Sequence, residues 1–187
     1  MTEEVHKAAE CIDSGGVILY PTDTIWGIGC DAKNSDAVEK IYRIKQRSDN
    51  KSMLVLMNGI PMLESYLEQV PEQTLEILNS ARKPTTIIYP GARNLAKNLL
   101  AEDGSLGIRI TSDPFCHQLI ELTGLPIVST SANISGLPSP SIFSEIESGI
   151  KGQVDYVVNW RQEEHEPATP SAIIKLGLQG DITILRP

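Results

Sequence analysis

The spacing of apolar residues in the first third of the chain switches repeatedly between a helical and an extended period. One set repeats at helical spacing: Val5, Ala8, Ala9 and Ile12. Thr2 can cap the helix that this set predicts, and Gly15-Gly16 can end it before the apolar run 17–20, which predicts a strand. Alternation of helix and strand favours an α/β fold.

The alternation continues through the rest of the chain. Ser35 can cap a second helix that ends near Lys45. The further elements that we expect are a strand at 53–57, helices near 61–69 and 72–81, strands near 85–89 and 106–110, a helix capped by Asp113, a short strand at 127–129, a short helix after the run 135–141, and strands near 154–158, 171–176 and 182–185. The last strands have no helices between them, so the sheet should be mixed, and 187 residues suit one domain, 1–187. The polar segment 161–169 predicts a surface loop.

Charge and composition exclude several classes of protein. The net charge of −8 is the wrong sign for broad contact with nucleic-acid phosphates. No stretch approaches the roughly 20 apolar residues that span a membrane, and the acidic start is unlike a secretory signal, so we expect a cytoplasmic protein without a membrane partner. The three cysteines and three histidines are scattered, which predicts neither a disulfide framework nor a built-in metal site.

The segment from Tyr20 to Cys30 combines proline, hydroxyl residues and two glycines at the end of a predicted strand. Glycine lets the backbone approach a ligand closely, so this segment could form a binding loop. A turn in which Thr22 and Asp23 make local hydrogen bonds explains the same residues. No Gly-Lys-Ser or Gly-Lys-Thr phosphate loop follows.

Four cations gather at the end of the second helix and in the loop beyond it: Arg43, Lys45, Arg47 and Lys51. In an acidic chain such a cluster is a candidate phosphate site, although cations also complement the dipole at a helix end, and a solvated basic end stays an alternative. If Lys45 and Arg47 are extended, their spacing of two places both side chains on one side. They could then share one phosphate chain.

A dense cluster of hydroxyl and amide side chains at 129–136 follows the apolar segment 125–128. Ligands gather at strand ends in α/β sheets, and Ser131 and Asn133 are again two residues apart, so both can face one ligand. An ordinary turn is the alternative. Arg109 lies in an apolar strand and suits either a carboxylate or phosphate ligand or a structural ion pair.

Together these segments resemble the YrdC-like family of threonylcarbamoyl-AMP synthases from about Gly15 to Arg186. The resemblance rests on motifs in this order: Tyr20-Pro21-Thr22-Asp23-Thr24, Lys45-Gln46-Arg47, Gly107-Ile108-Arg109, Ser131-Ala132-Asn133-Ile134-Ser135-Gly136, Pro170-Ser171 and Arg186-Pro187. It implies the short, single-domain form of the family, in which a twisted open sheet of parallel and antiparallel strands, flanked by helices, surrounds a large concave basic cavity.

The resemblance also implies roles for individual residues. It places the reaction site on Lys45, Arg47, Ser131 and Asn133. It assigns threonine contacts to Thr24, Arg109 and Ser171. It assigns ATP contacts to Arg47, Asn50, Thr86, Ser131 and Arg186.

The activity implied is the synthesis of threonylcarbamoyl-AMP and pyrophosphate from L-threonine, bicarbonate or CO₂, and ATP. Mg²⁺ would arrive with ATP and not at a site built into the protein. A separate transferase complex would carry the group to transfer RNA, which this chain would meet only indirectly. The alternatives are a YciO-like paralogue and a non-catalytic RNA- or nucleotide-binding protein of the same fold.

Overall fold

One mixed sheet runs through the computed structural model of the protein, which describes residues 1–47, 53–177 and 180–187. Its strand order is β7-β1-β2-β6-β3-β5-β4-β8-β9. The strands are β1 (Ile18–Tyr20), β2 (Gly27–Gly29), β3 (Leu54–Met57), β4 (Thr85–Tyr89), β5 (Leu106–Ile110), β6 (Ile127–Ser131), β7 (Tyr156–Val157), β8 (Ala172–Leu176) and β9 (Ile182–Arg186). Three strand pairs are parallel (β1–β7, β3–β5, β4–β8) and the other five are antiparallel, so the expected mixed α/β sheet is confirmed.

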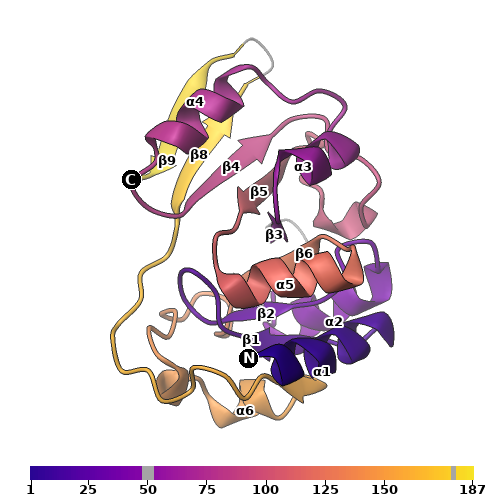
Figure 1. Ribbon diagram of the computed structural model, residues 1–187, viewed down its shortest axis with the longest axis vertical. Helices are drawn as coiled ribbons and strands as arrows, with labels where there is room; N and C mark the ends of the chain where they lie inside the picture. Colours follow the sequence, from indigo (N-terminus) through magenta and orange to yellow (C-terminus); the bar gives the residue numbers. More distant parts are fainter. Residues whose placement is uncertain (48–52, 178–179) are drawn as a thin grey trace.

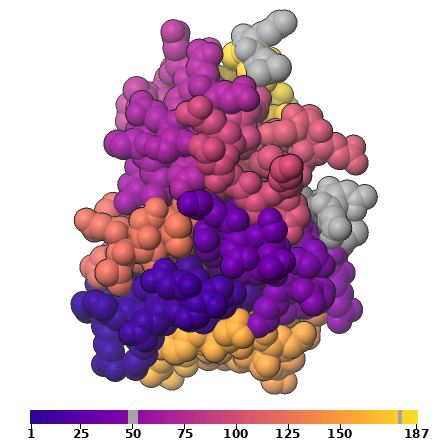
Figure 2. Space-filling view, turned by 90° about the vertical axis from the view of Figure 1, so that its right-hand side faces the viewer, coloured from indigo at the N-terminus to yellow at the C-terminus, as the bar shows by residue number. Residues whose placement is uncertain are grey.

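Helices flank this sheet at both ends of the molecule (Figure 1). They are α1 (Thr2–Asp13), α2 (Ser35–Ile44), α3 (Ile60–Tyr66), α4 (Gln73–Ser80), α5 (Pro114–Thr123) and α6 (Ser148–Lys151), with 3₁₀ turns at Lys97–Leu99 and Phe143–Glu145. Figure 2 shows the N-terminal residues and the segment near 150 together at one end, with residues 60–105 at the other. None of the described helices has the length and apolar character that a membrane crossing requires.

Successive residues of the central strands pack into two separate hydrophobic cores. Val55 and Val128 join the core that contains α2, whereas Leu56 and Ile127 join the core that contains α1 and α5. Side chains in a strand alternate between the two faces of a sheet, so each strand needs apolar residues at neighbouring positions to bury both faces. The two cores hold the strands rigidly, and the ends of these strands carry the site described below.

Several helix ends differ by one residue from the expectations drawn from the sequence. Thr2 is the first helical residue and Met1 takes the N-cap position. Asn34, not Ser35, caps α2 by accepting from Asp36 N and Ala37 N at 3.1 Å. Asn and Ser both cap well, so a run of two such residues leaves the boundary open. Asp113 caps α5 as expected, accepting from Cys116 N at 3.0 Å.

The segment 20–30 contains a strand that the sequence did not indicate. β2 pairs antiparallel with β1 on one side and with β6 on the other, so the expected loop is confined to residues 21–26. The two glycines of β2 are required by packing. A Cβ on Gly29 would lie 2.2 Å from the backbone oxygen of Val128, and one on Gly27 would lie 2.9 Å from Ser129 Oγ. Close strand packing therefore explains both glycines. Gly27 also lines the cavity described below.

Candidate functional site

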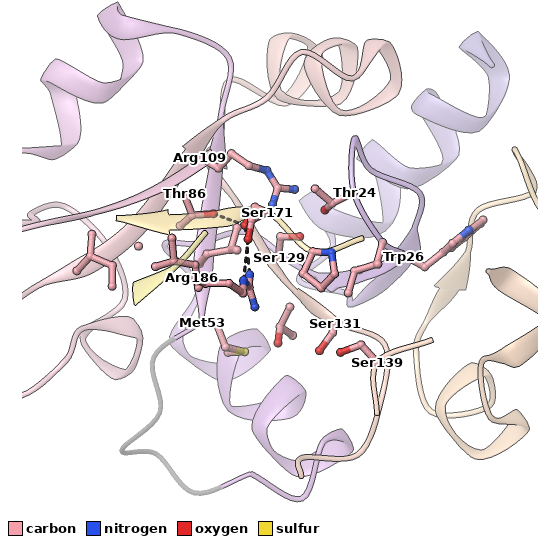
Figure 3. Close-up of a pocket in the computed structure, with 18 of the residues that line it drawn as sticks. Thr24, Trp26, Met53, Thr86, Arg109, Ser129, Ser131, Ser139, Ser171 and Arg186 are labelled. Carbon is pink, nitrogen blue, oxygen red and sulfur yellow. Dashed lines mark hydrogen bonds between the residues drawn. The ribbon is translucent and has the colours of Figure 1, made fainter. Parts of the chain in front are cut away.

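A cavity of about 870 Å³, counted with its opening to solvent, lies on one face of the sheet (Figure 3). Strand register explains its floor, because directly paired residues point to the same face: Leu54 pairs with Ser129, Ile88 with Gly107, and Thr86 with Ile173. The remaining lining residues are Thr24, Ile25, Trp26, Gly27, Arg47, Met53, Arg109, Thr130, Ser131, Ser139, Pro170, Ser171 and Arg186. The described lining thus has three arginines and many hydroxyls but no carboxylate.

Three polar side chains, from β4, from the residue directly before β8 and from β9, form a hydrogen-bonded row on one side of the cavity. Ser171 Oγ lies 2.8 Å from Thr86 Oγ1, and both residues are buried. Arg186 Nε donates to Ser171 O at 2.7 Å, and its Nη2 reaches Ser171 Oγ at 3.4 Å (Figure 3). Burial, and then the charge of Arg109, lower the pKa of Arg186. Two cations held near each other in this way favour an anionic ligand between them.

Arg109 extends from β5 into the same cavity. Figure 3 shows its guanidinium between Thr24 and Ser171. Its Nη2 lies 2.9 Å from Asp23 Oδ1, and only 3% of the arginine side chain and 10% of the aspartate side chain are exposed. The structure therefore combines the two possibilities open for Arg109, because the residue is ion-paired and it also lines the cavity.

Arg47 reaches the cavity from the end of α2. Its Nη1 lies 3.4 Å from Thr130 Oγ1 on β6, and the side chain is half-buried. Burial lowers the pKa of Arg47, although arginine stays charged at any physiological pH. A fixed guanidinium beside the hydroxyls of Thr130 and Ser131 is suited to binding phosphate oxygens.

Lys45 does not line this cavity, and the extended geometry that would place it on one side with Arg47 is not formed. The reason is the backbone: Lys45 ends α2 in a helical conformation and Gln46 is left-handed, with φ of 49°, so the segment is not extended. The ammonium group is buried, and Nζ donates to the backbone oxygens of Ser131 and Asn133. Burial and the charge of Arg47 lower the pKa of Lys45 to about 7.

Asn133 also points away from the cavity. Its Nδ2 donates to the backbone oxygens of Ile134 and Leu137 at 2.9 and 2.7 Å, which closes the turn after β6. The alternative of an ordinary turn therefore applies to Asn133, whereas Ser131 ends β6 and faces the cavity. Lys45 and Asn133 together fix the backbone that carries Ser131.

Comparison with known proteins fits this arrangement. The family model of the Sua5, YciO and YrdC proteins, described as "Telomere recombination", matches residues 10–187. The chain belongs to this family. A curated relative, the threonylcarbamoyl-AMP synthase of Pseudoalteromonas translucida (strain TAC 125), is 34% identical over 158 residues, which cover 83% of this chain and 84% of the relative.

Two solved structures of the Sua5, YciO and YrdC family share the fold. The H234A/Y235A variant of P. abyssi Sua5 superposes with a TM-score of 0.88 at 25% identity, covering 98% of this chain and 56% of the Sua5 chain. E. coli YciO superposes with a TM-score of 0.85 at 26% identity, covering 100% of this chain and 89% of YciO. This chain therefore spans a little over half of that Sua5 chain and most of YciO.

Most site residues expected from the resemblance to this family meet in the cavity. Those that line it are Thr24, Arg47, Thr86, Arg109, Ser131, Ser171 and Arg186. Lys45 and Asn133 lie behind it, and Asn50 falls outside the described residues. The expectations missed Ser129, Thr130, Ser139 and Ile173, which line the cavity as well. Ser129 and Thr130 belong to the hydroxyl cluster at 129–136, but no local signal distinguishes Ser139 or Ile173.

No group of three or more histidine, cysteine, aspartate and glutamate side chains in the described part of the chain could hold a metal ion. The arginines and hydroxyls of the cavity are donors suited to anions, and they are poor ligands for Mg²⁺, which prefers carboxylate and carbonyl oxygens. The chemistry of this donor set fits an anionic ligand.

Proposed function

We propose that this protein is a threonylcarbamoyl-AMP synthase, which joins L-threonine, bicarbonate or CO₂, and ATP into threonylcarbamoyl-AMP and pyrophosphate. The observation that carries the proposal is the placement of Arg109, Arg47 and Arg186 around one cavity, with hydroxyl groups between them and no carboxylate in its described lining. Such a site suits two anionic substrates held side by side. A synthase relative 34% identical to this chain supports the same assignment.

The proposed roles follow from the position of each side chain. Arg109, Thr24 and Ser171 lie together at one side of the cavity and would bind the carboxylate and polar groups of L-threonine. The ATP contacts would come from Arg47, Thr86, Ser131, Arg186 and Asn50, the last of which lies outside the described residues. The apolar floor of Leu54, Ile88 and Ile173 would receive the adenosine.

The reaction proceeds in two steps that need no covalent enzyme intermediate. First the uncharged amine of threonine attacks CO₂; an N–C bond forms and the nitrogen loses a proton, which gives a carbamate. A carbamate oxygen then attacks the α-phosphorus of ATP, the bond to the β-phosphate oxygen breaks, and pyrophosphate leaves. The protein contributes by positioning the two substrates and by stabilising the charge on the phosphate oxygens, chiefly through Arg47.

Lys45 and Asn133 would serve this chemistry indirectly, by fixing the backbone around Ser131. Mg²⁺ would enter as the complex with ATP and neutralise part of the phosphate charge. The adenylate is a reactive mixed anhydride. We propose that a separate transferase complex in the cytoplasm consumes it and passes the threonylcarbamoyl group to transfer RNA.

Pyrophosphate release tests the proposal. With Mg²⁺ present, pyrophosphate should form only when ATP, L-threonine and bicarbonate are all supplied. A nucleotide-binding protein of the same fold without this activity, including a YciO-like paralogue with another role, would release none under these conditions. An RNA-binding module would instead show RNA affinity that falls steeply with salt.

A further inference from the structure

Asp23 and Arg109 form a buried ion pair at the edge of the cavity. Arg109 lies on β5, whereas Asp23 lies in the loop of residues 21–26 between β1 and β2, and the two side chains meet at 2.9 Å. Removing both charges from water costs several kcal/mol per ion before their attraction is counted, so such a pair is not expected on grounds of stability alone. Its position beside a ligand cavity points to a role in binding.

The pair leaves hydrogen-bonding capacity on Arg109 unused. Its Nε and Nη2 are buried and have no hydrogen-bond partner among the described residues. The contact with Asp23 satisfies the distance of an ion pair, but its angles are not those of a hydrogen bond. Buried N–H groups without acceptors are costly, so the guanidinium of Arg109 favours an anionic acceptor beside it.

Asp23 touches Arg109 from outside the cavity. It lines a second, neighbouring cavity of about 640 Å³, together with Thr22 and Arg161, and it is not part of the lining of the first. The carboxylate therefore approaches the guanidinium without occupying the space of the ligand. An arginine fixed in this way presents its remaining N–H groups in one orientation.

The loop that carries Asp23 is itself held in place. Thr22 Oγ1 accepts from Thr24 N at 3.0 Å and donates to Ile25 O at 2.9 Å. Arg161 Nη1 donates to Thr22 O at 3.2 Å and to Asp113 Oδ2 at 2.8 Å, which ties the loop to α5. A carboxylate on a fixed loop can set the direction of a long side chain, because it has little freedom of its own.

We infer that Asp23 is a positioning residue for the substrate carboxylate, acting through Arg109 and without contact to the ligand. This inference rests on the proposed function, in which Arg109 binds the carboxylate of L-threonine. Without the charge of Asp23, the guanidinium keeps its place on β5 but loses its fixed orientation. The cost falls on threonine binding, and ATP binding and the chemical step change little.

A double-mutant cycle tests whether Asp23 acts through Arg109. Asp23→Asn should raise the KM for L-threonine by about tenfold, and leave kcat and the KM for ATP within about twofold. Arg109→Met should raise the same KM by about a hundredfold. The double variant should match Arg109→Met within about twofold, because the effect of Asp23 disappears once its partner is gone.

Control variants separate positioning from stability. Asp23→Glu keeps the charge and should hold the KM for L-threonine within about threefold of the wild-type value. Asp155→Asn removes an ion pair with Lys40 that is remote from both cavities, and should leave that KM unchanged. Circular dichroism of each variant reports whether it folds. If Asp23→Asn does not fold, the kinetics of Asp23→Glu are compared with those of the wild type instead.

Any of three results would overturn the inference. The first is a KM for L-threonine in Asp23→Asn within twofold of the wild-type value, and the second is a KM in the double variant that equals the product of the two single effects. The third is a KM for L-threonine that rises as much in Asp23→Glu as in Asp23→Asn. Calorimetric titration of the wild-type protein with L-threonine distinguishes this failure from failure of the proposed function. Absence of both threonine binding and pyrophosphate release contradicts the synthase assignment and the positioning role together. Threonine binding that is unaffected by Asp23→Asn contradicts the positioning role alone.

Discussion

The ammonium nitrogen of Lys45 lies 2.8 Å from the backbone oxygen of Asn133, deep beneath the turn that follows β6. It also donates to the backbone oxygen of Ser131, and the backbone oxygen of Lys45 accepts from Ser135 N at 2.8 Å. One residue at the end of α2 therefore holds the turn after β6 at three points. A cation in this position acts on the site by fixing the backbone.

Lys45→Met should abolish most of the synthase activity and also destabilise the fold. Methionine matches the length of the lysine stem but removes the Lys45 donor from the buried backbone oxygen of Asn133, at a cost of about 1–3 kcal/mol, and leaves Ser131 O with the backbone N–H of Asn133 alone. We expect kcat for pyrophosphate release to fall by about a hundredfold, because a misplaced backbone around Ser131 disturbs the geometry of the reaction. Steady-state kinetics with a thermal unfolding curve measure both effects. Wild-type kcat in this variant would contradict the role given to Lys45.

The stability of the fold should depend on pH through Lys45. Its pKa is about 7 in the folded protein against 10.5 for an ordinary lysine, so between these values the unfolded chain binds more protons. The free energy of unfolding therefore rises with pH from about 7 to about 10.5. Below about pH 7 the buried lysine is charged, and its full destabilising effect on the fold is present. The measurement is the difference in unfolding free energy between wild type and Lys45→Met from pH 6.5 to 9.5. It should shift in favour of the wild type as pH rises, and a constant difference would contradict the prediction.

Arg186→Met should weaken ATP binding selectively. Arg186, the last residue of β9, lines the cavity and donates a hydrogen bond to the backbone oxygen of Ser171. Losing one charge-assisted contact to a phosphate or ribose oxygen should raise the KM for ATP by about tenfold, and the KM for L-threonine by no more than about threefold. Lys175→Met on the neighbouring β8 is the matched control, because Lys175 forms an exposed pair with Asp103 outside the cavity. Equal kinetics for Arg186→Met and the control would contradict this assignment.

Gly29→Ala should destabilise the protein through a backbone clash. The added methyl would lie 2.2 Å from Val128 O and 2.7 Å from the ring of Tyr20, and all of these atoms are buried in the sheet. Strands must shift to accept it, which should lower the free energy of unfolding by about 2–4 kcal/mol. Urea unfolding measures the loss. Gly149→Ala in α6 is the control, since no atom lies within 4 Å of its Cβ, and it should be neutral or slightly stabilising.

The fold was predictable where signals are local. β4, β5 and the start of α5 agree with the residues expected, because β-branched runs and an Asp-Pro cap act within a few positions. β2 was not predictable. Gly27 and Gly29 have no side chains, so the segment shows no alternation of apolar and polar residues. The strand forms because its backbone pairs with β1 on one side and with β6 on the other.

The site was predictable as a set of residue types and less so as a geometry. Polar residues at strand ends, such as Ser131, Thr86 and Arg109, indicated where ligands could gather, and they do share one cavity. The different directions of the Lys45 and Arg47 side chains could not be predicted, because Lys45 is helical and Gln46 between them is left-handed. Ser139 reaches the cavity only through the folded path of a loop, which leaves no trace in local sequence.

The central claim is that this cavity makes an adenylate from three substrates, and incorporation of labelled bicarbonate tests it most directly. The protein is incubated with ATP, Mg²⁺, L-threonine and ¹³C-bicarbonate, and the products are separated and identified by mass spectrometry. We predict threonylcarbamoyl-AMP that carries the label, in equal amount to the pyrophosphate released, and a loss of about a hundredfold in Arg47→Ala. Absence of labelled adenylate, or pyrophosphate release that does not require threonine, would contradict the claim.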